Sequence, residues 1–422
     1  MRRALPVVLF ALVAGRTATA APTLTELLDA SRGANLDVRE QASVIAERDA
    51  AARVEHGSLW PRLSASADYL RNQHAVVVDI PRGAMDPLAA TITPTNQLDA
   101  TLQLDVPLVD LGARRRTVAA DRELDAARAA RDVTATEVER SIVRAYFQWV
   151  GGTALLASTS AARDADAADV KILETRFAAG LVQELDLARA RAQVARADQT
   201  LAEAQLAIAT ARRTLRTLTG IDPGADAPAL PADTSAEPPV ERWLAAVGGA
   251  PEVTSATATA LAAEARATAA RWSYAPTLGA LARERFTNAA GFGDIANWTV
   301  GVAATWALDR ATAARIDQSA ATAATSQLRI AHARQDVHDR IVDAWTQIDA
   351  LRARTVAATA QADAEHLAGT LAVAKLGGGQ ATQLDVVLAK RDALDADVAL
   401  VQARADLAAA RALLRLAAGQ RP

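Results

Sequence analysis

The sequence contains no cysteine among its 422 residues. This absence excludes disulfide bonds, cysteine-ligated zinc and thiol catalysis together. No GxSxG, P-loop or GxGxxG motif is present, so the usual signatures of serine hydrolases and nucleotide-binding enzymes are missing. His332 and His338 are the nearest pair among the five histidines, but a spacing of six does not align them on one helix face. We therefore expect no enzyme activity, no cofactor and no metal site.

Aromatic residues and net positive charge are also scarce. Aromatics make up 4% of the chain while hydrophobic residues make up 51%, so alanine supplies much of the apolar content. Alanine-rich seams suit helices that pack side by side at close approach. The formal net charge is −3, and it becomes −6 without residues 1–20, which carry three arginines and no acidic residue. This balance gives no reason to expect nucleic acid as a partner.

Long apolar runs are missing beyond the N-terminus. Residues 1–21 have the pattern of a secretory signal peptide, with Arg2 and Arg3, a short apolar region, and a small-residue cleavage site at Ala18-Thr19-Ala20. The alternative, a membrane anchor, needs roughly 20 apolar residues, and no lipobox cysteine follows. If the mature protein crosses a membrane, we expect it to do so with strands.

A helix–turn–helix with a glycine-containing turn occurs twice. In each copy a cation ends the incoming helix, a glycine allows the left-handed exit, and an acidic residue follows in the outgoing helix. Gly180 and Gly379 lie 199 residues apart, and the same offset relates other pairs: Val138 and Val337, Tyr146 and Trp345, Gly220 and Gly419. We predict a tandem duplication with a first repeat at 22–220, a proline-rich linker at 221–239 and a second repeat at 240–419.

Each repeat is predicted to contain a half-length helix, a strand pair, a long helix, a tip turn and a second half-length helix. The strand pairs are expected at about 61–70 with 98–108 and at about 276–286 with 298–308, and 71–97 is expected to be a polar loop. The long helices are expected at 111–178 and about 310–376, and the tip turns at 176–183 and 375–382. Half-length helices stacked end to end beside continuous ones form a cylinder wall of uniform height.

The strands alternate apolar and polar residues. Trp298 and Trp306 lie on one face of the last strand, eight residues and about 26 Å apart, which matches the edges of an apolar band about 25 Å tall. A soluble sheet core is the other interpretation, but we favour a lipid-facing surface whose interface belt comprises Tyr69, Trp298 and Trp306. Membrane barrels begin at eight strands, so four strands require oligomerisation.

These features together resemble the TolC-type outer-membrane efflux family. The residues that carry the resemblance are the strand entries Trp60-Pro61 and Ala275-Pro276, and the turn Arg176-Phe177-Ala178-Ala179-Gly180-Leu181 with Leu185-Asp186. The resemblance implies a mainly α protein with a membrane β part: a homotrimer with a long α-helical barrel, in which four strands per protomer form a twelve-stranded β-barrel. It implies a location in the outer membrane of a Gram-negative bacterium, in contact with its lipid, with helices extending through the periplasm.

The resemblance also implies a passive exit duct of a tripartite efflux or type I secretion system. Its partners would be a periplasmic adaptor (membrane fusion) protein and an inner-membrane pump. Position by position, the adaptor-docking tip would comprise Arg176, Phe177, Gly180, Leu181, Lys375, Leu376 and Gly379.

Asp186 and Asp385 would lie at the periplasmic aperture. The alternative role for both is that of a first-turn acid favouring the helix dipole, worth about 0.3–1 kcal/mol. The family's second acidic position is Leu388 here, and Leu376 and Ala381 replace its latch partners.

A periplasmic coiled-coil adaptor or scaffold without a pore is the alternative function. Such a protein would show one helical hairpin flanked by β-rich domains, with no duplicated strand pairs. The residues do not identify the exported cargo.

Overall fold

The computed structural model describes residues 21–83 and 85–421, which form two units. The predicted signal peptide therefore lies outside the described residues, apart from Ala21. The tip unit contains the described residues up to Leu36, Ala135–Leu244 and the described residues from Arg340 onward. The sheet unit contains Asp37–Thr134 and Ala245–Asp339.

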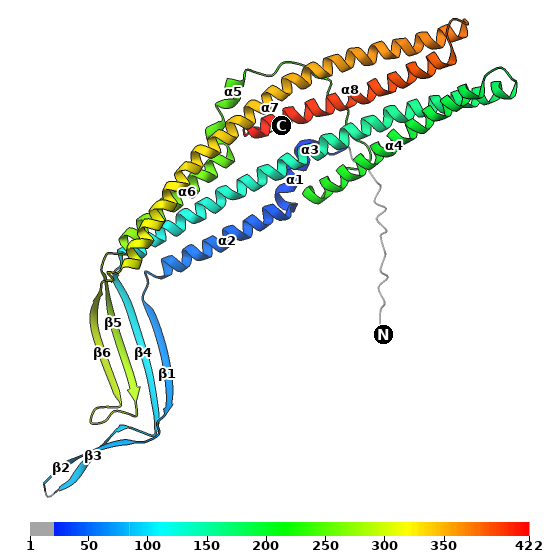
Figure 1. Ribbon diagram of the computed structural model, residues 1–422. Coiled ribbons are helices and arrows are strands. Elements are labelled where there is room, and N and C mark those ends of the chain that lie inside the picture. Colours follow the sequence, from blue (N-terminus) through cyan, green and yellow to red (C-terminus); the bar gives the residue numbers. More distant parts are fainter. Residues whose placement is uncertain (1–20, 84, 422) are drawn as a thin grey trace, which may run out of the picture. The chain divides into compact units, whose positions relative to one another are not determined.

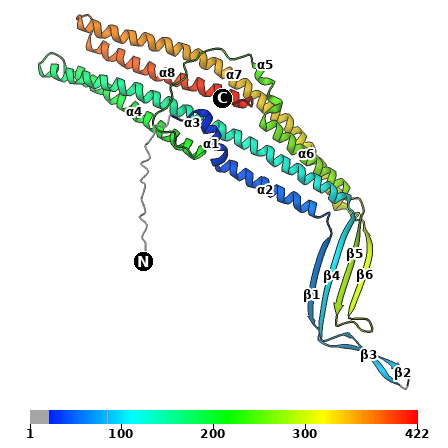
Figure 2. The ribbon, with the colours of Figure 1, turned by 180° about the vertical axis from the view of Figure 1, so that it is seen from behind.

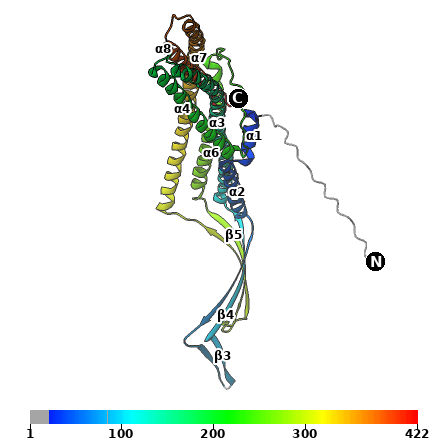
Figure 3. The same cartoon turned by 90° about the vertical axis from the view of Figure 1, so that its right-hand side faces the viewer.

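The sheet unit is organised around one four-stranded antiparallel sheet (Figure 1). Its strands are β1 (Arg62–Arg71), β4 (Asn96–Val109), β5 (Thr277–Thr287) and β6 (Ala296–Thr305), in the order β1-β4-β5-β6. They occupy the four segments expected to be strands, although β6 ends before Trp306. Figure 3 shows the sheet nearly edge-on, as a single layer with no helix against either face.

A second, two-stranded sheet lies within the segment expected to be a loop. Its strands are β2 (Val76–Arg82) and β3 (Met85–Thr93). The loop prediction for 71–97 was therefore wrong. Val76-Val77-Val78 and Ile80 are β-branched residues that favour extended backbone, and this preference outweighed the polar residues and prolines nearby.

The helices of the sheet unit are α2 (Leu36–Gly57), α6 (Pro251–Trp272) and the first parts of α3 (Leu111–Ala178) and α7 (Arg310–Gly377). Both long helices begin with the same cap. The carboxylate of Asp110 accepts from the Ala113 amide at 2.7 Å, and that of Asp309 accepts from the Thr312 amide at 2.7 Å. Asp110 and Asp309 are 199 residues apart, so the strand-to-helix junction is built twice in the same way.

The tip unit consists of helices that pack along alanine seams. It contains α1 (Leu24–Ala34), α4 (Glu184–Thr219), α5 (Val240–Leu244), α8 (Gln383–Ala417) and the remaining parts of α3 and α7. A buried alanine recurs every seventh residue in α4 and α8: Ala190, Ala197, Ala204 and Ala211, and Ala396, Ala403, Ala410 and Ala417. A seven-residue repeat favours left-handed supercoiling, and the small side chains allow close approach. Figure 2 shows α4 running beside α3 and α8 beside α7, seen from behind.

Two helices expected to be continuous are interrupted. The segment 24–58 divides at Asn35, whose backbone is extended and whose amide closes α1 on the Ser31 carbonyl. The segment 240–272 divides into α5, a 3₁₀ turn at Val247–Gly249, and α6, which begins at Pro251. Proline is favourable in the first turn of a helix but cannot continue an earlier one.

The proline-rich linker is held against α8 by a group that we call the linker clamp: Arg411, Asp233, Ser235 and Glu237. The Arg411 guanidinium donates to the Asp233 carbonyl and carboxylate, both at 2.9 Å, and pairs with Glu237 at 3.0 Å. It also donates to the Ser235 carbonyl. The side chains of Arg411 and Glu237 are only 10% and 12% exposed, so this ion pair is largely desolvated, whereas the Asp233 side chain is 61% exposed.

Candidate functional site

The first hairpin tip ends α3 with a left-handed glycine. Gly180 has φ +71°, and its amide donates to the Phe177 carbonyl at 2.9 Å. The Leu181 amide donates to the Arg176 carbonyl at 2.9 Å. This closure satisfies carbonyls left unpaired at the helix end. Phe177 is 42% exposed and Leu181 is 74% exposed, so the tip presents apolar side chains.

The second tip repeats this geometry. Gly379 has φ +73°, and its amide donates to the Leu376 carbonyl at 3.1 Å. The Gln380 amide donates to the Lys375 carbonyl at 2.8 Å. Lys375 is exposed and Leu376 is half-buried. The backbone of the two tips is thus equivalent, residue for residue, at the offset of 199. The assignment of these residues to adaptor docking stays a prediction.

The two predicted aperture aspartates differ in their surroundings. The Asp385 carboxylate accepts from the Thr382 amide at 2.7 Å and from the Thr382 hydroxyl at 2.8 Å, completing a capping box at the start of α8. The Thr382 backbone and side-chain hydrogen bonds lower the pKa of Asp385 below its ordinary value. Asp186 lies after Gln183, whose side chain makes no cap, and it approaches Arg189 at 4.0 Å. Asp385 therefore completes the cap whose N-cap residue is Thr382, and an aperture role for either aspartate stays a prediction.

Ion pairs link the helices of the tip unit above the turns. Lys390 on α8 contacts Asp169 on α3 and lies 3.8 Å from Asp166. Burial raises the pKa of Asp166. Arg196 on α4 makes a two-pronged contact with Asp395 on α8, at 3.0 and 3.1 Å. Sequence reasoning missed these contacts. The one signal was that Arg196 and Asp395 are themselves 199 residues apart.

One face of the four-stranded sheet is polar and internally bonded. The Arg285 guanidinium donates to the Asp99 carboxylate at 2.7 Å, and Arg283 donates to the Gln103 side chain at 2.9 Å. Gln103 in turn donates to the Asp105 carboxylate at 2.7 Å. These residues occupy the same face of β4 and β5 in the observed register. This face is suited to contact with water.

The opposite face of the sheet is exposed and mostly apolar, with Glu284 between Leu102 and Trp298 as its charged residue on β5. Its β6 side chains include Trp298, Val300 and Val302, with exposed fractions of 76%, 68% and 67%. Leu63 on β1 is 65% exposed and Leu102 on β4 is 45% exposed. Soluble monomers rarely leave such a continuous apolar surface uncovered. The sheet therefore has one polar face suited to contact with water and one face suited to contact with an apolar environment.

The predicted belt aromatics lie at the two ends of this apolar face. Tyr69 is two residues from the end of β1, and Trp298 is two residues from the start of β6, both at the loop end of the sheet. The Tyr69 hydroxyl donates to the Asn96 side chain at 3.0 Å. Trp306 lies at the helix end, is 63% exposed, and donates its indole N–H to the Tyr274 carbonyl at 2.8 Å. Their role as a membrane belt stays a prediction.

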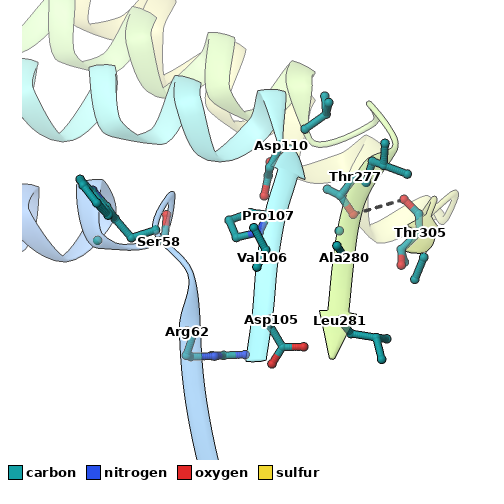
Figure 4. A pocket seen from close by; sticks show the side chains of 16 residues that line it. Ser58, Arg62, Asp105, Val106, Pro107, Asp110, Thr277, Ala280, Leu281 and Thr305 are labelled. Carbon is teal, nitrogen blue, oxygen red and sulfur yellow. Dashed lines mark hydrogen bonds between the residues drawn. The ribbon is translucent and has the colours of Figure 1, made fainter. Parts of the chain in front are cut away.

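A hollow of about 390 Å³ lies where the strands meet the helices (Figure 4). Its lining includes Asp105 and Asp110, and Thr277 donates to the Thr305 carbonyl at 3.5 Å. Both carboxylates are engaged elsewhere, because Asp105 accepts from Gln103 and Asp110 caps α3. The hollow is therefore explained by the way the strands meet the helices at this junction.

No helix in the described part of the chain combines the length and hydropathy needed to span a membrane.

A family model described as outer membrane efflux protein matches residues 27–221 and 245–420. The chain is 28% identical over 256 residues to the outer membrane efflux protein BepC of Brucella suis biovar 1 (strain 1330). That alignment covers 60% of this chain and only 56% of BepC, little more than half of the relative's length.

Solved outer membrane proteins share the fold. The outer membrane protein VceC of Vibrio cholerae matches with a TM-score of 0.76 and 20% identity, over 94% of this chain and 96% of VceC. The open state of the MtrE outer membrane channel of Neisseria gonorrhoeae matches with a TM-score of 0.77 and 19% identity, over 94% of this chain and 89% of MtrE. At these identities the likeness is one of fold.

Proposed function

Because the chain belongs to the outer membrane efflux protein family, we propose that it is a passive exit duct through the outer membrane. In this proposal the sheet of each protomer contributes to a membrane-spanning wall, and the helices prolong the bore into the periplasm. Energy for export comes from an inner-membrane pump of an efflux or type I secretion system. The cargo is set by that pump.

The observation that carries this proposal is the two-faced sheet with open edges. The sheet order makes β1 and β6 its outermost strands. Its apolar face is exposed and its other face carries a charged network. A sheet of this kind satisfies its edges by pairing with copies of itself. Three copies supply twelve strands, enough to close a barrel with lipid outside and water inside.

The hairpin tips support the rest of the proposal. Two long hairpins end in equivalent glycine turns that expose Phe177 and Leu181. Apolar side chains at the end of a helical hairpin suit contact with the helical end of another protein. We propose that the tip residues named above contact a periplasmic adaptor. A pore-less adaptor is disfavoured as the function of this chain because both strand pairs join one sheet, and the family match extends over both halves.

Reconstitution tests the duct directly. The purified full chain should run as a heat-resistant trimer on unboiled gels, and it should produce discrete conductance steps in planar lipid bilayers. A monomer that inserts into no bilayer would overturn the proposal. The unfolded, boiled protein added at the same concentration is the control for detergent leakage.

A further inference from the structure

Arginines and tryptophans gather where the strands meet the helices. We call this group the junction belt: Arg114, Arg115, Arg271, Arg310, Trp272 and Trp306. All four arginines are exposed, and Trp272 and Trp306 are 38% and 63% exposed. All six residues belong to the sheet unit.

The belt lies at one level along the sheet unit. Arg114 and Arg115 fall in the first turns of α3, directly after β4, and Arg310 is the first residue of α7. Arg271 falls in the last turn of α6, shortly before β5. One helical turn rises about 5.4 Å, and the headgroup layer on each side of a bilayer is roughly 5–8 Å thick. With the apolar face of the sheet in hydrocarbon, these arginines therefore reach the headgroup layer.

The helices that carry the belt arginines also line a hollow of about 750 Å³, with contributions from Arg116, Ser273 and Thr312. Each of these three residues lies two positions, about 200° around a helix, from Arg114, Arg271 or Arg310, whereas Arg115 is only about 100° from Arg116. Ala307 lines the same hollow, and its neighbour Trp306 continues the apolar face of β6. By this spacing Arg114, Arg271 and Arg310 lie on the side of their helices away from the hollow.

The two sides also differ in charge balance. On the hollow side Arg116 pairs with Glu55 at 3.3 Å and with Asp110 at 3.9 Å. Within the part of the chain that the structure describes, no carboxylate pairs with a belt arginine. Arg115 instead lies over the Trp272 ring, 5.7 Å from its centroid, in a cation–π contact that orients the guanidinium. The belt arginines therefore form no ion pair among the described residues, and Arg115 has an aromatic ring beside it.

This combination matches the chemistry of a phospholipid headgroup. Guanidinium groups bind phosphate through two parallel hydrogen bonds, and tryptophan favours the boundary between headgroups and acyl chains. The Trp306 N–H already donates to the Tyr274 carbonyl at 2.8 Å, which fixes the ring at the apolar side of the belt.

We propose that the junction belt binds the phosphate groups of anionic phospholipids in the leaflet nearest the helices. The inference rests on the proposed insertion of the sheet into the outer membrane. Each basic residue near an anionic membrane surface strengthens binding about fivefold, so the wild-type protein should prefer phosphatidylglycerol to phosphatidylcholine with the same acyl chains.

A charge-matched pair of variants tests the belt. The belt variant is Arg114→Gln with Arg115→Gln. The control variant is Arg329→Gln with Arg334→Gln, two exposed arginines that lie about 28 and 36 Å along α7 from its first residue. Full-length protein in detergent is titrated with phosphatidylglycerol or phosphatidylcholine, and bound lipids are counted by native mass spectrometry. Inorganic phosphate is added in a separate titration.

We expect the belt variant to lose about 25-fold of its preference for phosphatidylglycerol, with little change in the control variant and no competition from inorganic phosphate. Equal preference in wild type and belt variant, or a wild type indifferent to the headgroup, overturns the inference. Competition by free phosphate overturns the assignment to lipid. Unboiled gels and bilayer conductance are recorded for every variant, so that loss of the channel itself is distinguished from loss of lipid binding.

Discussion

A charge placed at the centre of β6 distinguishes lipid from water on each face of the sheet. Val302 lies four residues from both Trp298 and Trp306 on the apolar face, and its side chain is 67% exposed. If this face contacts hydrocarbon, Val302→Arg places a guanidinium near the middle of the bilayer. The expected cost is about 2–4 kcal/mol per copy. In the proposed trimer, three copies together would lose about 6–12 kcal/mol.

The matched control is the next residue along the strand. Ala303 is exposed on the polar face, where Ala303→Arg puts the same charge into water. A surface substitution of that kind changes stability by about 0.5 kcal/mol or less. Both variants are refolded into phosphatidylcholine vesicles and titrated with urea, with tryptophan fluorescence and unboiled gels as readouts. Equal losses for the two variants would refute a lipid-facing β6.

Three further predictions concern the tip unit. Valine at Gly180 and Gly379 forces a β-branched residue into the left-handed region, at roughly 1–2 kcal/mol per site, and should abolish export in cells while conducting trimers persist. Arg411→Met leaves the Glu237 carboxylate of the linker clamp unpaired, and we expect it to lower the free energy of unfolding by about 3–5 kcal/mol, measured by thermal unfolding. The control, Arg421→Met, removes only an exposed ion pair with Asp29, worth about 0–1 kcal/mol. The lowered pKa of Asp385 stabilises the folded state above the ordinary value of 3.8, and this effect is lost as pH falls through the folded value. Protection of the amides at the start of α8, taken relative to their intrinsic exchange rates, should therefore fall below that pH in wild type and stay constant in Asp385→Asn.

Each of these has a contrary result. Normal export by the double valine variant would remove the docking claim for the tips. Equal melting temperatures for the two methionine variants would mean that the linker clamp adds nothing beyond a surface pair. If the protection of the α8 amides still depended on pH in Asp385→Asn, the effect would belong to another group.

The long helices were predictable because few residues interrupt them. α3 spans Leu111–Ala178, as expected from a stretch without proline, and α7 ends one residue beyond the expected bound. The tips were predictable because glycine at a positive φ follows a basic helix end in both copies. In these places local preference and tertiary structure favour the same conformation.

Other features depend on contacts between distant segments. The β2–β3 hairpin was missed because its valines lie among prolines and polar residues. The break at Asn35 was missed because a single asparagine within an apolar-periodic helix carries little signal. Partners such as Lys390 with Asp169 depend on how α3 and α8 lie beside each other, which no local pattern reveals. The alternative considered for Asp385 from the sequence was a first-turn acid favouring the helix dipole; its hydrogen bonds with Thr382 in the capping box are a further contact that the sequence analysis did not predict.

Cross-linking of strand edges tests most directly whether sheets of different protomers join. The chain has no cysteine, so every disulfide formed reports an engineered pair. Cysteines are introduced in pairs, one at Ala65 or Ala67 on β1 and one at Val300 or Val302 on β6, and outer membranes are oxidised and run on non-reducing gels. A closed wall made of three sheets predicts cross-linked dimers and trimers for the pairs in register, with no larger species. Only monomers across the whole panel, from protein that is present in the outer membrane, would contradict it.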